Sequence, residues 1–318
     1  MRSEEQAVDL RRSEAAGRPV GRRMAAGEWG LLVALSVLWG GAFFFTGVAV
    51  RELPPLTIVL LRVGLAALAL AVVVRALGFA MPRDARSWGG LFAMGLMNNA
   101  LPFSLVAWGQ THVASSMAAI LNATAPFATL ILAHAFTEAE KMTPLNVGGV
   151  AAGVVGVAVL VGSGAEGFGG DLGAQLAILL AAMSYAAAAV FGLRLRNGHG
   201  APLVHATGQL IAAAVLLAPV AAVVDGPFEL AAVSAETWAA IAGLAVLSTG
   251  LAYVLYFALL ERAGASNLLM VTFLIPVSAC VLGVAFLGET IGAREVCGFL
   301  IIAAGLLVID GRIFSRAG

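Results

Sequence analysis

The chain has 318 residues, of which 61% are hydrophobic and only 11% charged, and its mean hydropathy is +0.97. A water-soluble domain of this length cannot cover so apolar a core with so little polar surface, so lipid must solvate most of the chain. The formal net charge is zero, which argues against nucleic acid as a partner. The two cysteines, Cys280 and Cys297, lack metal-ligand spacing and predict small core residues; we expect no metal and no cofactor.

The first 28 residues are polar, carry six arginines, and lack the apolar core and cleavage site of a signal peptide. They predict a disordered cytoplasmic tail over 1–28. A second, short cytoplasmic tail is expected at 313–318, where the last apolar run has ended.

Apolar runs long enough to cross a bilayer need about 20 residues. The sequence has ten of them, roughly at 29–50, 56–77, 88–109, 114–135, 144–162, 172–193, 202–224, 238–260, 265–287 and 295–312. The connections are short, so consecutive helices are antiparallel. The chain is therefore predicted to be an all-α integral membrane protein with ten transmembrane helices.

Arginine and lysine residues orient these helices, because cytoplasmic loops carry an excess of both. With a cytoplasmic N-terminus, fifteen basic residues fall inside the cell, and Arg51 and Arg294 fall outside. Arg62, within the second run, completes the 18 basic residues. Both termini are expected to be cytoplasmic.

The second half of the sequence repeats the first. A shift of 150 positions brings Ser116 onto Ser266, Pro126 onto Pro276, and Phe136 onto Phe286. Each copy holds five spans, 29–162 and 172–312. Because five is odd, the second copy enters the membrane from the opposite side, so the halves are inverted repeats. This is the build of secondary transporters, with substrate near the midplane between the halves and access that alternates as they rock.

The motifs LWGGAFF at 38–44 and PPLTIVLLRVG at 54–64, with the twin proline–glutamate–glycine segments, resemble the drug/metabolite transporter superfamily. Within it, the chain is most similar to ten-helix EamA-type permeases. The resemblance implies export, less often import, of small polar metabolites such as amino acids across a bacterial inner membrane. One departure is an extra residue in the elbow 137–141, where relatives carry a pair like Gly288-Glu289, so Glu138 and Glu140 receive no specific role.

Polar residues at depth are the candidates for the substrate site, because burying them in a membrane is unfavourable unless they pair or line water. Asn98 and Asn99 lie mid-span before Pro102, and their repeat equivalents are Ser248 and Thr249. Amide donors and acceptors suit the carboxylate or ammonium of a zwitterion. The alternative is helix–helix hydrogen bonding, worth less than about 1–2 kcal/mol.

Prolines and aromatic residues add further candidates at the same depth. Pro126 and Pro276 are each expected to kink a helix, as a fixed bend or as a hinge. Asn122, one turn before Pro126, either satisfies freed backbone or faces the pathway. The aromatic residues Trp39 and Tyr185, at matching depth, and Tyr253, one turn beyond Thr249, either wall an apolar pocket or pack ordinarily.

Arg62 is the only basic residue predicted within a span. It either contacts an anionic group of the substrate, or snorkels to the outer face and has a structural role, which is slightly favoured. No Asp or Glu lies deep in any predicted span, which disfavours carboxylate-based proton coupling. His134 and His205 near span ends are expected to be inert interfacial residues.

The sequence thus predicts a monomeric, multi-pass transporter of the bacterial inner membrane whose partners are a small-molecule substrate and the lipid bilayer. The substrate is expected to be a small polar metabolite, an amino acid first, moved outward. Another solute class, such as a drug or a sugar-like metabolite, is the alternative. An intramembrane enzyme is disfavoured because no nucleophile with its base, HExxH helix or aspartate pair lies at depth.

Overall fold

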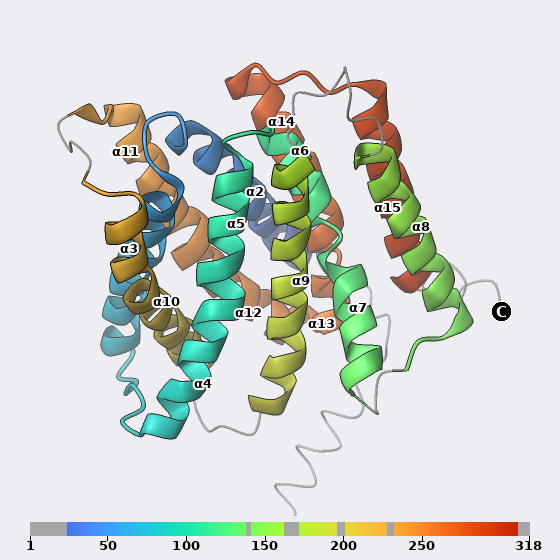
Figure 1. Cartoon of the computed structure of the whole chain (residues 1–318). Coiled ribbons are helices and arrows are strands. Elements are labelled where there is room, and N and C mark those ends of the chain that lie inside the picture. The colour runs from blue at the N-terminus through green and yellow to red at the C-terminus, as the bar shows by residue number, and fades with distance from the viewer. Residues whose placement is uncertain (1–23, 138–140, 162–171, 196–200, 228–231, 311–318) are drawn as a thin grey trace, which may run out of the picture.

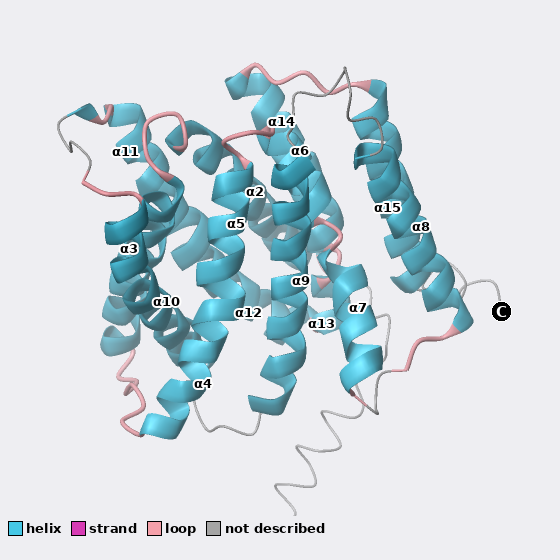
Figure 2. Ribbon diagram, viewed as in Figure 1, coloured by secondary structure: helices cyan, strands magenta, loops and turns pink. Residues whose placement is uncertain are grey.

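A computed structural model describes residues 24–137, 141–161, 172–195, 201–227 and 232–310 of the chain. Most of both predicted tails, and the elbow residues Glu138 and Glu140, lie outside this part. Every regular element in the described ranges is helical, as predicted for an all-α membrane protein (Figure 2).

The helices form a bundle whose connections alternate between its two ends (Figure 1). In chain order they are α2 (Ala26–Ala49), α3 (Pro55–Ala76), α4 (Ala85–Gly95), η1 (Leu96–Ala100), α5 (Leu101–Gly109), α6 (Ser115–Asn122), α7 (Ala125–Phe136), α8 (Pro144–Val161), α9 (Leu172–Leu195), α10 (Pro202–Val224), α11 (Ala235–Ala242), η3 (Gly243–Leu251), α12 (Ala252–Ala263), α13 (Ala265–Leu268), α14 (Val271–Leu287) and α15 (Ala293–Asp310). The helix α2 begins at Ala26, three residues before the predicted start of the first span.

Eight helices, or continuous helical runs, are long and apolar enough to cross a membrane among the described residues. They correspond to the first eight predicted spans, with bounds that differ by a few residues. The helix α14 is apolar but has only 17 residues. The helix α15 carries Arg294, Glu295 and Asp310 within its 18 residues. The last two spans therefore stay predictions.

Two of the long runs are not regular α-helices through the middle. Residues Leu96–Ala100 of the third span and Gly243–Leu251 of the eighth form π-helix. A π-turn widens the helix and shifts which side chains face inward, and such turns often occur at functional sites. Both segments hold polar residues that the sequence selected, Asn98 and Asn99 in one and Ser248 and Thr249 in the other.

The two mid-span prolines have different structural consequences. The fourth span breaks between α6 and α7, so Pro126 occupies the first turn of α7, where its missing N–H removes no bond. The Thr124 hydroxyl donates to the carbonyl of Leu121 (2.6 Å) at this break. The expectation that Asn122 satisfies this freed backbone is not met. Pro276 instead lies inside the continuous helix α14.

Helices of the first half pack mainly on helices of the second. The closest pairs across the halves are α8 with α15, α2 with α14, α3 with α10, α5 with α9, and α7 with α9. Between α8 and α15 the backbones approach so closely that a Cβ on Gly149 would lie 2.7 Å from the carbonyl oxygen of Gly305. The glycines of these two helices serve internal packing.

Candidate substrate-binding site

Six polar side chains from five helical segments meet in the interior of the bundle. This polar cluster consists of Arg62 from α3, Asn98 and Asn99 from η1, Gln209 from α10, Thr249 from η3 and Tyr253 from α12. Asn98 lies eleven residues from the end of α5, roughly 16 Å along the helix axis, which is near the middle of its span.

Arg62 is 9% exposed, so its charge is withdrawn from the surface. Its Nε donates to the Thr249 hydroxyl (3.0 Å), and its guanidinium carbon lies 3.7 Å from the centre of the Phe103 ring. That hydroxyl donates in turn to the Leu244 carbonyl (2.8 Å), which fixes its orientation. The guanidinium is therefore held over an aromatic face, a favourable cation–π arrangement. The expectation that Arg62 snorkels to the outer surface is not met.

No described residue forms an ion pair with Arg62, and its terminal nitrogens donate no hydrogen bond within the described part of the chain. A guanidinium offers five N–H donors, and only Nε is engaged. The planar edge that suits a carboxylate is thus left without a protein acceptor.

An amide–phenol network forms the other side of the polar cluster. The Tyr253 hydroxyl accepts from the amides of Asn98 and Gln209, both at 3.4 Å, and donates to Asn99 Oδ1 at 3.3 Å. The Asn98 amide also donates to Gln209 Oε1 at 3.2 Å. Asn99 is 0% exposed, yet its Nδ2 has no hydrogen-bond partner among the described residues. A buried donor without a partner is unfavourable by about 1–3 kcal/mol, so it indicates a missing acceptor.

Aromatic rings line both sides of the polar cluster. Phe103 contacts Tyr185 with ring centres 6.4 Å apart. On the other side Tyr253 stacks on Phe257 at 6.2 Å, Phe257 contacts Tyr256 at 5.3 Å, and Tyr256 contacts Trp39 at 5.6 Å. Tyr185 therefore borders Arg62 through Phe103, whereas Trp39 is linked to the cluster only through other rings.

Ser248 and Asn122, which were also predicted, form no hydrogen bond with the polar cluster among the described residues. Ser248 lies next to Gly41 of α2, where a Cβ on that glycine would be 3.9 Å from its hydroxyl. Ser248 is 1% exposed and its hydroxyl has no partner among the described residues. Asn122 lies at the break between α6 and α7, and its buried Oδ1 is likewise unpaired in the described structure.

Gln209 belongs to the polar cluster but was not among the predicted site residues. The signal was present in the repeat, because Gln209 aligns with Arg62 when the second spans of the two halves are superposed. A glutamine in an apolar helix is a weaker signal than an arginine, so only the structure identifies its contacts with Asn98 and Tyr253.

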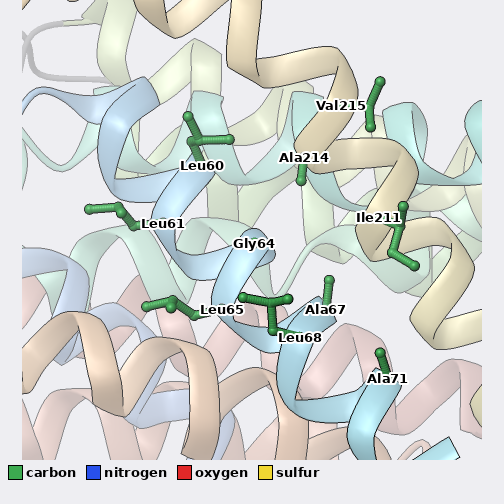
Figure 3. A pocket seen from close by; sticks show the side chains of 10 residues that line it. All are labelled: Leu60, Leu61, Gly64, Leu65, Ala67, Leu68, Ala71, Ile211, Ala214 and Val215. Carbon is green, nitrogen blue, oxygen red and sulfur yellow. The ribbon is translucent and has the colours of Figure 1, made fainter. Parts of the chain in front are cut away.

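A separate hollow of about 470 Å³ lies between α3 and α10 (Figure 3). Its lining is apolar throughout and includes Leu60, Leu61, Gly64, Leu65, Ala67, Leu68, Ala71, Ile211, Ala214 and Val215. Leu68 is 67% exposed, which places the hollow on the outside of the bundle. We call it the α3–α10 groove. It offers no group that would orient a polar solute, and an apolar groove on this surface suits the acyl chains of lipids.

Comparison with known proteins agrees with this architecture. The chain is 27% identical over 289 residues to the uncharacterized inner membrane transporter YedA of Escherichia coli, covering 90% of this chain and 92% of that protein. It is 25% identical over 294 residues to a protein of Streptantibioticus cattleyicolor named a probable terminal-alkyne amino-acid exporter, covering 92% and 96%. A solved crystal structure with 18% sequence identity superposes with a TM-score of 0.65 over 90% of this chain and 97% of that one, which shows the fold.

The model of the EamA-like transporter family matches residues 28–162 and 172–310. The predicted multi-pass membrane location agrees with the eight apolar helices that are long enough to cross a membrane in the described part of the chain. The chain belongs to the EamA-like transporter family and is a multi-pass membrane transporter.

Proposed function

We propose that the protein moves small amino acids, or closely similar zwitterions, by alternating access, and that they bind at the polar cluster. Arg62 carries the proposal, because a buried guanidinium whose binding edge lacks a protein acceptor needs an anion. An ionisable side chain at membrane depth is disfavoured by about 2.5–3.5 kcal/mol, and such residues usually have a functional role.

The inverted-repeat architecture is supported by the helix pairs. If the first five spans exchange with the last five, α2 with α14 becomes α9 with α7, and η1 with α10 becomes η3 with α3; all four pairs are in contact. The α3–α10 and α8–α15 pairs map onto themselves. The two π-segments also occupy equivalent spans, and the family model matches the chain in two stretches.

The polar contacts follow the same relation. Arg62 of α3 binds Thr249 of η3, and its equivalent Gln209 of α10 binds Asn98 of η1, next to the equivalent of Thr249. The two halves thus present similar hydrogen-bonded pairs. The Arg62–Thr249 pair is cationic, and the Gln209–Asn98 pair is neutral. This asymmetry suits a zwitterion, with its carboxylate at Arg62 and its ammonium near the amide and phenol oxygens. The aromatic rings of Phe103 and Tyr185 would then flank an apolar side chain.

Amino acids are favoured over other solutes for two further reasons. Phosphorylated solutes need several cations, and Arg62 is the one that the described cluster contains. A relative is also named as an amino-acid exporter, which supports export as the direction.

Ligand-induced stabilisation of the purified protein tests the substrate class. An amino acid that binds should raise Tm, whereas the amine that lacks only its carboxylate should not. The matching carboxylic acid without the amino group should bind with intermediate strength. An amine that stabilises as well as its parent amino acid would remove Arg62 as the carboxylate contact. Reconstituted protein should also move the stabilising amino acid down its concentration gradient.

Labelling of single cysteines tests ten spans with both termini cytoplasmic. A membrane-impermeant thiol reagent should reach Arg51→Cys from outside intact cells and Arg83→Cys only from inside. Labelling of both from one side would contradict this topology.

A further inference from the structure

Three carboxylates join the two halves at one end of the bundle. Each lies at the end of a helix or in a loop of one half, and each accepts hydrogen bonds from the first backbone N–H groups of a helix of the other half. The helix starts involved, those of α3, α6 and α11, all lie at the upper end in Figure 1. The arginine count assigns this end to the outside of the cell.

Glu289, in the turn after α14, caps α6. Its two oxygens accept from the N–H groups of Ser115 (2.7 Å) and Ser116 (3.0 Å). The N-terminus of a helix leaves such donors unsatisfied and carries partial positive charge, so a carboxylate there is well matched. A Cβ on Gly283 would lie 2.3 Å from Glu289 Oε2, so a glycine is required where α14 passes this carboxylate.

Asp225, at the end of α10, caps α3 in the same way. Its Oδ2 accepts from the N–H of Thr57 (2.6 Å) and from the Thr57 hydroxyl (2.8 Å). Glu52, between α2 and α3, accepts from the N–H of Ser234 (2.9 Å) at the start of α11. The Ser234 N–H, with the hydroxyls of Thr237 and Ser234, holds the pKa of Glu52 below its ordinary value.

We infer that Glu289, Asp225 and Glu52 form a latch that holds the outer face of the transporter closed. The inference rests on the proposed alternating access, in which the halves must separate at the outer face to open the polar cluster to the outside. All three contacts join helix ends that belong to different halves, so an outward movement of these ends breaks each of them. Asp84 offers a matched contrast: it caps α4 through the Ser87 N–H (2.8 Å) at the opposite end, within one half.

Access to a single cysteine tests the latch without any substrate. Replacing Cys280 and Cys297 by alanine removes both native thiols, and Asn98→Cys then reports on the polar cluster. A membrane-impermeant maleimide is added to intact cells, and the labelling rate is compared between the reporter alone and the reporter with each latch substitution.

Glu289→Gln and Asp225→Asn should each raise the labelling rate roughly tenfold, because each weakens a charge-assisted contact made of two hydrogen bonds. Glu52→Gln should raise it about twofold to threefold, because Glu52 is exposed and accepts one backbone bond. Gly283→Ala should act like Glu289→Gln while it leaves all three carboxylates in place.

Asp84→Asn and Gly64→Ala are the controls, and both should leave labelling unchanged; a Cβ on Gly64 meets no atom within 4 Å. Labelling that stays at the reporter's rate in Glu289→Gln, Asp225→Asn and Gly283→Ala would overturn the latch. An equal rise in Asp84→Asn would overturn it too, since it would indicate general loosening. A normal labelling response, together with no amino-acid flux through protein in which Asn98 is intact, would instead overturn the proposed substrate and leave the latch standing.

Discussion

The helices α3 and α10 have two contrasting faces. Toward the interior they present Arg62 and Gln209 to the polar cluster, and toward the outside they enclose the apolar α3–α10 groove. The groove is an apolar hollow of about 470 Å³, whereas the cluster has the charge, the directed donors and the unpaired amide. Volume alone would select the groove, but an open apolar groove in a membrane protein is filled by lipid, whereas buried polar residues at membrane depth usually have a functional role.

Substitution of Arg62 should give the largest effect. The Arg62→Gln substitution makes the hydrogen-bonded pair with Thr249 neutral, like the pair of Gln209 with Asn98. The carboxylate of the substrate then loses its charged partner. Affinity for the stabilising amino acid should fall roughly 30-fold or more, since such contacts are worth about 2–5 kcal/mol. Ligand titrations by thermal shift measure this. Arg75→Gln, which removes an exposed charge from the same helix, is the control; equal losses in both variants would contradict the site.

The double substitution Asn98→Ala with Asn99→Ala should reduce transport about tenfold, because several hydrogen bonds of about 1 kcal/mol each disappear. The loss should appear in flux into proteoliposomes at subsaturating substrate, with Tm of the unliganded protein little changed. Unaltered flux would mean that the amide network only joins helices. Arg62 alone would then support a substrate site on the inner face of α3 and α10.

Substitution of one helix glycine on each face tests the difference between the polar cluster and the groove by steric crowding. A Cβ on Gly95 would lie 2.6 Å from the carbonyl oxygen of Gln209, whereas a Cβ on Gly64 in the groove meets nothing within 4 Å. Gly95→Ala should therefore displace α10 at the polar cluster and lower flux several-fold, since overpacking typically destabilises by about 1–3 kcal/mol. Gly64→Ala should leave flux within about twofold. Similar losses in the two variants would show that flux depends on general helix packing.

A change of pH should have the smallest effect. The six side chains of the polar cluster include no Asp, Glu, His or Cys, so none of them titrates between pH 6 and 8 at ordinary pKa values. Affinity for a zwitterion that keeps its charges over this range should change less than about twofold. A stronger dependence, measured by the same thermal-shift titration, would require a titrating group outside the described cluster.

Most residues of the polar cluster could be selected as candidates from the sequence, because polar residues at membrane depth are rare and easily seen. Arg62, Asn98, Asn99, Thr249 and Tyr253 lie together in the structure. Ser248 does not join them, because neighbouring residues of a helix point in different directions and a π-turn changes the phase. Gln209 was not selected as a candidate, because its contacts with Asn98 and Tyr253 depend on which helices pack against α10.

The sequence by itself determined the helical membrane class, the two-fold repetition and the family, because hydropathy, arginine distribution and spaced motifs are properties of a linear pattern. Only the tertiary structure decided which polar residues meet, that α6 and α7 break before Pro126, and that Glu289 spans the two halves. These features depend on side-chain direction and on contacts between residues far apart in the chain, and local sequence contains neither.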